Sequence, residues 1–142
     1  MDDLFVHGEC KMLDELKMAA KIAYSKVDRE FDPRNFWLGC VGFRKDGTLV
    51  SARNGAVMAS DWKKKHLIPG AHAEIRTARK GANILFVARV SKVEGNLVMA
   101  RPCGICQCFT RSLKVEKIYY TINENQYGVY HPLSNYDRVH NC

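Results

Sequence analysis

Two short motifs, far apart along the chain, constrain what this sequence can fold into. They are His72-Ala73-Glu74 and Pro102-Cys103-Gly104-Ile105-Cys106. Thiols three residues apart lie on one face of a helical first turn, where unpaired N–H groups and the helix dipole favour a thiolate. Pro102 suits the start of such a helix because it has no N–H to leave unsatisfied. Two thiolates and one imidazole supply three ligands for a tetrahedral zinc ion and leave the fourth position open for water.

Glu74 lies two residues beyond the imidazole, where a carboxylate could hold that water and shuttle its proton. Either motif alone is a weak signal, but together, in this order and about 30 residues apart, they form a recognised signature of zinc-dependent deaminases. At these residues the chain resembles the cytidine deaminase superfamily, from its first expected helix to about residue 130. The resemblance implies that His72, Cys103 and Cys106 bind Zn²⁺ and that Glu74 is the catalytic proton shuttle. The implied reaction is hydrolytic deamination of cytosine to uracil, with release of ammonia.

The resemblance also suggests which residues bind the substrate. Asn54 looks like the asparagine with which related deaminases hold the sugar or base, although an Asn before Gly is also typical of a turn. Arg101 directly precedes the Pro-Cys pair, where it could meet a 5′-phosphate or lie as a charge on the rim. The Pro-Cys-Gly-Ile-Cys-Gln run resembles free cytidine deaminases, whereas a first-ligand histidine resembles deoxycytidylate and nucleic-acid deaminases. We expect a small-molecule cytosine nucleoside or nucleotide as the substrate.

Two alternatives stay open. A deaminase of single-stranded DNA, RNA or tRNA is favoured by the net charge of +7 and by the lysine loop from Lys63 to Lys65. A non-catalytic zinc module for nucleic acid would instead complete a four-ligand site on Cys103 and Cys106. Its other ligands would come from His131, His140 or Cys142, and Tyr119, Tyr120 and Tyr127 would stack on bases. That module leaves His72-Ala73-Glu74 unexplained.

Length and composition suit an ordinary globular protein. A chain of 142 residues with 46% hydrophobic residues can bury a core, and we treat residues 1–142 as a single zinc domain. No segment approaches the roughly 18 apolar residues of a membrane span, and the acidic N-terminus lacks a secretory leader. We expect a cytoplasmic protein with no membrane partner, and a homo-oligomer.

The six cysteines favour metal binding over disulfides, because no secretion signal is visible. Cys108 follows Cys106 by two residues, and helical residues two apart point away from each other. We therefore expect Cys108 to be a buried thiol outside the metal site.

Hydrophobic periodicity predicts an α/β fold. Helices are expected over residues 10–27, 72–80 and 103–113, and strands over 36–43, 48–57, 84–88, 97–100, 117–122 and 127–130. Asp46-Gly47 predicts a hairpin turn, and Gly81 suits a helix end. Four residues between the last two strands are too few for a parallel crossover, so those strands should form an antiparallel hairpin. The resemblance implies a three-layer α/β/α cytidine-deaminase-like fold, a mixed sheet of about five strands, and both motif helices on one face.

Overall fold

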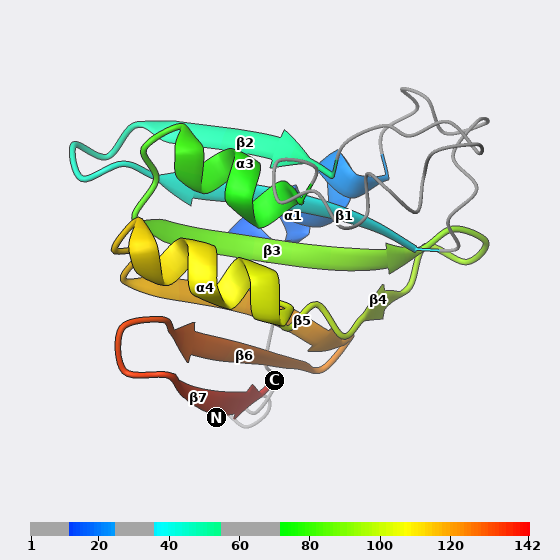
Figure 1. Ribbon diagram of the computed structural model, residues 1–142. Helices are drawn as coiled ribbons and strands as arrows, with labels where there is room; N and C mark the ends of the chain where they lie inside the picture. The colour runs from blue at the N-terminus through cyan, green and yellow to red at the C-terminus, as the bar shows by residue number, and fades with distance from the viewer. Residues whose placement is uncertain (1–11, 25–35, 55–71) are drawn as a thin grey trace, which may run out of the picture.

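The computed structural model describes residues 12–24, 36–54 and 72–142, and in these ranges helices cover both faces of one mixed sheet (Figure 1). Helix α1 (Asp14–Ala23) lies on one face of the sheet. Helices α3 (Ala73–Arg79) and α4 (Gly104–Ser112) lie side by side on the other. The α/β class, the mixed sheet and the shared face of the two motif helices are confirmed.

Within the described ranges the sheet has seven strands. They are β1 (Phe36–Phe43), β2 (Leu49–Arg53), β3 (Ile84–Ser91), β4 (Leu97–Val98), β5 (Lys117–Asn123), β6 (Gln126–His131) and β7 (Tyr136–Asn141). Their order is β2-β1-β3-β5-β6-β7, and the short β4 pairs with β3. β3 and β5 run parallel, and the other pairs are antiparallel.

Local turn chemistry predicted several of these elements correctly. The β1–β2 hairpin turns at Asp46-Gly47, where Gly47 has a φ of +88° that suits glycine. Helix α3 ends just before Gly81, which has a φ of +98°. β5 and β6 pair antiparallel with Ile118 opposite Tyr130, as predicted, and only Glu124 and Asn125 connect them.

The expected strand count of about five is wrong, because the short β4 pairs with β3 and because β7 follows β6 and pairs with it. Strand β7 is polar and mostly exposed, so it lacks the apolar alternation that marks a half-buried strand. Among the described residues the first helix begins at Asp14, and β2 ends at Arg53. Residues 10–11, 25–27 and 55–57 of those predicted elements, and the lysine loop from Lys63 to Lys65, lie outside the described residues.

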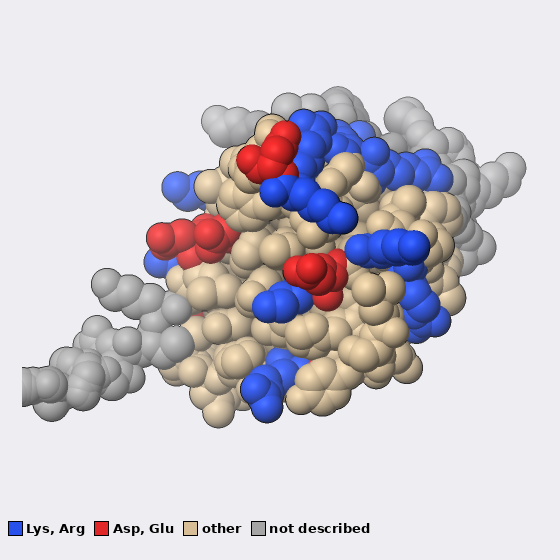
Figure 2. All heavy atoms as spheres, turned by 90° about the vertical axis from the view of Figure 1, so that its left-hand side faces the viewer, with Lys and Arg blue, Asp and Glu red and all other residues tan. Residues whose placement is uncertain are grey.

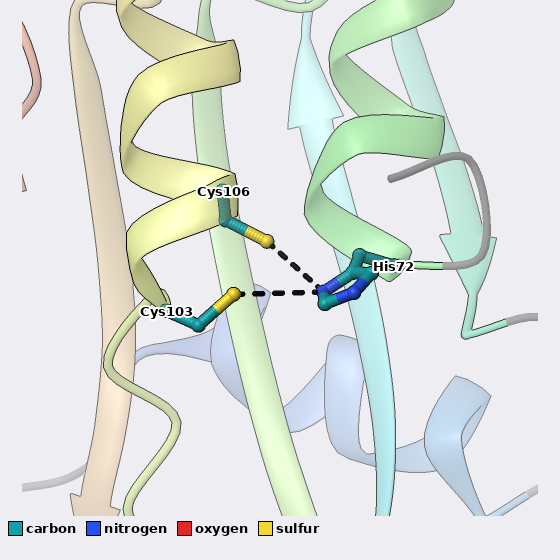
Figure 3. A group of neighbouring side chains, drawn as sticks. All are labelled: His72, Cys103 and Cys106. Atoms are coloured by element: carbon teal, nitrogen blue, oxygen red, sulfur yellow. Dashed lines mark hydrogen bonds between the residues drawn. The ribbon is translucent and has the colours of Figure 1, made fainter. Parts of the chain in front are cut away.

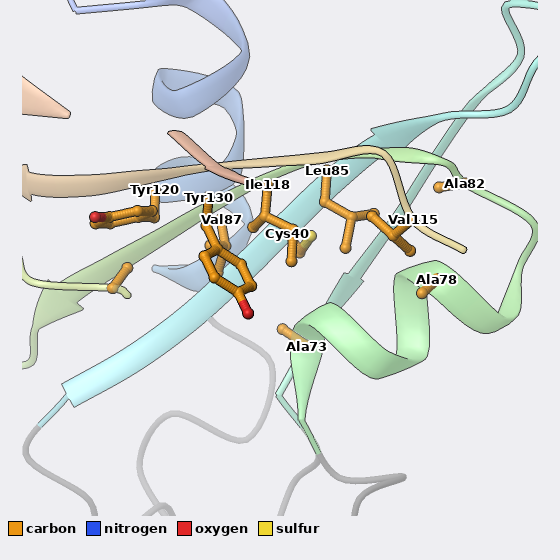
Figure 4. Packing of buried hydrophobic residues seen from close by; sticks show 11 residues of the cluster. Cys40, Ala73, Ala78, Ala82, Leu85, Val87, Val115, Ile118, Tyr120 and Tyr130 are labelled. Carbon is orange, nitrogen blue, oxygen red and sulfur yellow. The ribbon is translucent and has the colours of Figure 1, made fainter. Parts of the chain in front are cut away.

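Two apolar layers hold the helices to the sheet. The layer under α3 joins Ala73 and Ala78 of the helix to Cys40, Leu85 and Val87 of the strands (Figure 4). The layer under α1 contains Leu16 and Ala19 packed against Val41, Phe86 and Ala88. Because side chains alternate along a strand, β1 and β3 contribute residues to both layers. Across residues 12–24, 36–54 and 72–142, no helix is long and apolar enough to cross a membrane.

Candidate metal site

The two motif helices point their N-termini at the same place (Figure 3). His72 is the N-cap of α3, with φ −80° and ψ 137°, and Cys103 is the N-cap of α4, with φ −71° and ψ 170°. Neither side chain caps its own helix, so both remain available to face across the gap. Cys106 follows on the first turn of α4. The unpaired N–H groups of two helix ends favour negative charge on groups held between them.

The imidazole of His72 faces both thiols across the gap between α3 and α4 (Figure 3). Its Nδ1 is 3.3 Å from Cys106 Sγ and 3.7 Å from Cys103 Sγ, and the three ligand atoms all lie within 4.8 Å of one another. Zinc bond lengths of roughly 2.0–2.3 Å in a tetrahedron place nitrogen and sulfur ligands about 3.5 Å apart. The group therefore fits a tetrahedral ion, and these three residues could bind a metal. The described part of the chain contains no other such group of three or more His, Cys, Asp or Glu.

The two thiols have opposite tendencies to ionise. A hydrogen bond with Cys106, and then one with His72, lowers the pKa of the Cys103 thiol. The same hydrogen bond with Cys103, followed by burial, raises the pKa of Cys106. Cys103 is exposed and Cys106 is buried. Cys103 is thus the thiol that ionises first, and a bound cation would favour the thiolate form of both.

Glu74 lies in the first turn of α3 and is only 3% exposed. Burial is the main cause that raises its pKa, and the Cys103 thiolate adds to the rise. The His72 imidazole and a hydrogen bond with Cys106 act in the opposite direction. These interactions place the carboxyl group beside the metal group while its burial favours the neutral form. A carboxyl group of this kind can take up and release a proton nearer to neutral pH than an exposed glutamate can.

Asn54 is buried at the end of β2, where it ties β2 to β1. Its backbone N–H donates to Leu38 O at 3.1 Å, and its Oδ1 accepts a hydrogen bond from Leu38 N at 3.3 Å. Arg76, one turn into α3, donates from Nη1 to Arg53 O at 2.9 Å. The first half of α3 therefore contacts the β2 residue just before Asn54, which places this asparagine at the same end of the sheet as the metal group.

Arg101 pairs with a carboxylate on the last strand. Its Nη2 and Nε lie 2.6 and 3.0 Å from Asp137 Oδ2, and its guanidinium lies over the Tyr130 ring. The bond to Asp137 raises the pKa of Arg101. The sequence suggested either a phosphate contact or a charge on the rim for Arg101. In the structure, Arg101 forms an ion pair with Asp137 of the same chain.

The alternative zinc ligands lie elsewhere. His131 stacks on Tyr136 and His140 stacks on Tyr127, and within the described ranges neither belongs to a metal-binding group. The prediction that Cys108 is buried is wrong, because this thiol is exposed. Cys106 faces inward, and a residue two positions further along a helix points to the opposite side.

The sequence analysis did not single out Gln107, which supports the loop that leads to Cys103. Gln107 Nε2 donates to Pro102 O at 2.9 Å, and Tyr130 OH lies 3.5 Å from Gln107 Oε1. The position of Gln107 directly after Cys106 could have indicated this role, because a side chain in the first turns of a helix can reach back to the preceding loop.

A scan against protein-family models found no match to this chain, and a search of curated proteins likewise found none.

Proposed function

We propose that this protein is a zinc-dependent hydrolase that deaminates the cytosine of a nucleoside or nucleotide. The observation that carries the proposal is the position of His72 Nδ1, 3.3 and 3.7 Å from two thiol sulfurs, with a buried glutamate beside the group. Two thiolates and one imidazole form a donor set typical of zinc, and three protein ligands are typical of its catalytic sites.

When bound in such a site, zinc supplies Lewis-acid chemistry that brings the pKa of water close to neutrality. The protein's own part of the reaction falls to Glu74. Its carboxylate takes a proton from the attacking water and delivers it to the ring nitrogen next to the amine-bearing carbon. The water oxygen becomes bonded to that carbon, Glu74 passes the remaining proton of this hydroxyl group to the amine, and the bond between the carbon and the amine nitrogen breaks to release ammonia. Because Glu74 is buried beside the ligands, the proton moves within a region from which bulk water is largely excluded.

A deaminase of single-stranded nucleic acid remains the second candidate, and the distribution of charge bears on it. Lys and Arg side chains gather on the end of the molecule shown in Figure 2, where α3 and α4 finish. The exposed basic residues of those last turns are Arg79, Lys80, Arg111 and Lys114. α4 has nine residues and so is about 13 Å long, which separates this basic end from the metal group at the helix N-termini. Basic residues at helix C-termini also stabilise the helix dipole. The basic residues therefore lie away from the metal group, and the net charge of the chain is weaker support for a polymer substrate than it is without regard to their position.

The test measures ammonia release and product from one panel of substrates at equal concentration. The panel holds cytidine, deoxycytidine, their monophosphates, adenosine and cytosine-containing oligonucleotides. We expect conversion of the monomeric cytosine compounds to the uracil products. Preferential conversion within the oligonucleotides would favour the second candidate, and zinc-loaded protein that releases no ammonia from any member would refute both.

A further inference from the structure

Asn54, Leu38 and Arg89 form a row across three neighbouring strands. Leu38 of β1 lies opposite Arg89 of β3 in the sheet register. On its other side, Leu38 exchanges hydrogen bonds with Asn54, which accepts from its N–H at 3.3 Å and donates to its carbonyl at 3.1 Å. Two interstrand spacings of roughly 4.8 Å give this row a length of about 10 Å. The row is polar at both ends and apolar in the middle.

The row lies on the face of the sheet that carries α3 and α4. Side chains alternate along a strand, so Arg89 shares a face with Leu85 and Val87, which pack in the layer under α3. Leu38 packs against the same layer.

The row also lies at the end of the sheet where these helices begin. Arg89 Nη1 donates to Met99 O at 3.4 Å, in the segment that leads to the Cys103 N-cap. Arg76, one turn into α3, donates to the carbonyl of Arg53, the neighbour of Asn54. Both ends of the row are thus connected to the segments that carry the candidate metal ligands.

Arg89 is a cation without a carboxylate partner among the residues that the structure describes. Its guanidinium lies 4.5 Å from the ring centroid of Phe36. Its Nε is buried and makes no hydrogen bond within those ranges, and burial lowers the pKa of Arg89. Arg101, by contrast, is paired with Asp137. A partly buried arginine normally has a counter-ion, because taking a charge out of water is costly.

We propose that Arg89 binds the 5′-phosphate of a cytosine nucleotide, with Leu38 beneath the nucleoside and Asn54 at the far end of the row. The proposal rests on the proposed function and narrows it to a nucleoside monophosphate. A guanidinium placed over an aromatic ring still presents a planar set of N–H donors that matches phosphate oxygens. Arg89 takes the role that the sequence suggested for Arg101.

The experiment compares the binding of deoxycytidine and its 5′-monophosphate by calorimetry at low and moderate salt. Wild-type protein should bind the monophosphate at least tenfold more tightly, and this preference should weaken with salt. Arg89→Met keeps an unbranched stem against Phe36 but removes the charge, and should weaken monophosphate binding roughly tenfold to a hundredfold. Arg89→Lys should retain part of the preference. Arg138→Met removes an exposed cation from β7, outside the row, and should leave the preference unchanged.

The outcomes of this experiment distinguish a failure of the phosphate site from a failure of the deaminase reaction. Equal affinity of the wild-type protein for the two ligands, or an unaltered preference in Arg89→Met, would overturn the phosphate site even if ammonia is released. An Arg89-dependent preference without ammonia release from any substrate would leave a nucleotide-binding site and refute the deaminase. If circular dichroism shows that Arg89→Met does not fold, Arg89→Lys decides: a preference equal to that of the wild type, with no change in its salt dependence, would count against guanidinium recognition.

Discussion

Asp137 of the last strand holds Arg101 at the point where the chain leads into α4. Its Oδ2 accepts hydrogen bonds from the guanidinium at 2.6 and 3.0 Å, and its Oδ1 accepts one from Tyr120 OH at 2.9 Å. One carboxylate therefore connects β7, β5 and the residue before Pro102-Cys103. The side chains of Arg101 and Asp137 are 44% and 25% exposed, so water screens the ion pair between them.

A double-mutant cycle on Arg101→Gln and Asp137→Asn should give a coupling energy of about 0.5–1 kcal/mol, as expected for a screened pair. The measurement is the free energy of unfolding in urea for the wild type, both single variants and the double variant. Additive losses would show that the two side chains do not stabilise each other. Asp137→Asn should be the more damaging single change, because it also weakens the hydrogen bond to Tyr120.

Tyr120 should titrate late and make stability depend on alkaline pH. Burial, followed by the hydrogen bond to Asp137, raises its pKa from 10.0 to about 12. The unfolded chain loses this proton near the ordinary value while the folded protein keeps it, so the free energy of unfolding should fall as pH rises across that interval. Tyrosinate absorbance and urea unfolding measure the two effects. Tyr120→Phe should remove this part of the pH dependence, and an unchanged alkaline profile would contradict the assignment.

Metal content should separate two cysteines of the same helix. We expect about one zinc per chain in the wild type and little in Cys106→Ser, because Cys106 Sγ lies 3.3 Å from His72 Nδ1. Cys108→Ser is the matched control, since this thiol is exposed and lies outside the metal group. Elemental analysis decides the matter. Full zinc retention in Cys106→Ser, or equal loss in both variants, would exclude the proposed ligand set.

Glu74→Gln should keep the fold and the metal and lose turnover by a factor of roughly a hundred or more, because glutamine cannot carry the proton. Glu116→Gln changes an exposed glutamate and should behave like the wild type. Kinetics and elemental analysis are measured on the same samples. Loss of zinc together with activity would make Glu74 a ligand instead.

The same substitution should alter the pH dependence of the metal-free protein. The pKa of Glu74 is raised by burial, so its contribution to stability is fully present below the ordinary glutamate pKa and is lost as pH rises through the raised value. Glu74→Gln should flatten this decline. The melting temperature across acidic to neutral pH, measured with a chelator present, tests it, and parallel curves for the two proteins would speak against a buried, ionisable Glu74.

Features set by local chemistry could be predicted from the sequence. Asp46-Gly47 produces the β1–β2 turn and Gly81 ends α3, since each depends on a backbone conformation that few residues adopt. The nearness of His72 to Cys103 and Cys106 could also be predicted, because histidine and cysteine side chains are both common zinc ligands. Membership in the cytidine deaminase superfamily, the homo-oligomer and the cytoplasmic location stay predictions.

Features set by the register of the sheet could not be predicted. β7 is an exposed edge strand, so the pattern of burial that reveals other strands is missing from its sequence. Arg89 lies in a largely apolar run of residues. Its proposed role in phosphate binding depends on its position opposite Leu38 and on the hydrogen bond between Leu38 and Asn54. No spacing along the chain encodes that row.

The attachment of Arg101 to Asp137 also bears on the order of events during synthesis. A ribosome makes the chain from its N-terminus, so all three candidate metal ligands are made before residue 137 exists. Until β7 has paired with β6, the loop before Cys103 lacks the ion pair that fixes Arg101. The ion pair that fixes Arg101 is accordingly completed only after β7 has been translated, later than the synthesis of the three residues that could bind a metal.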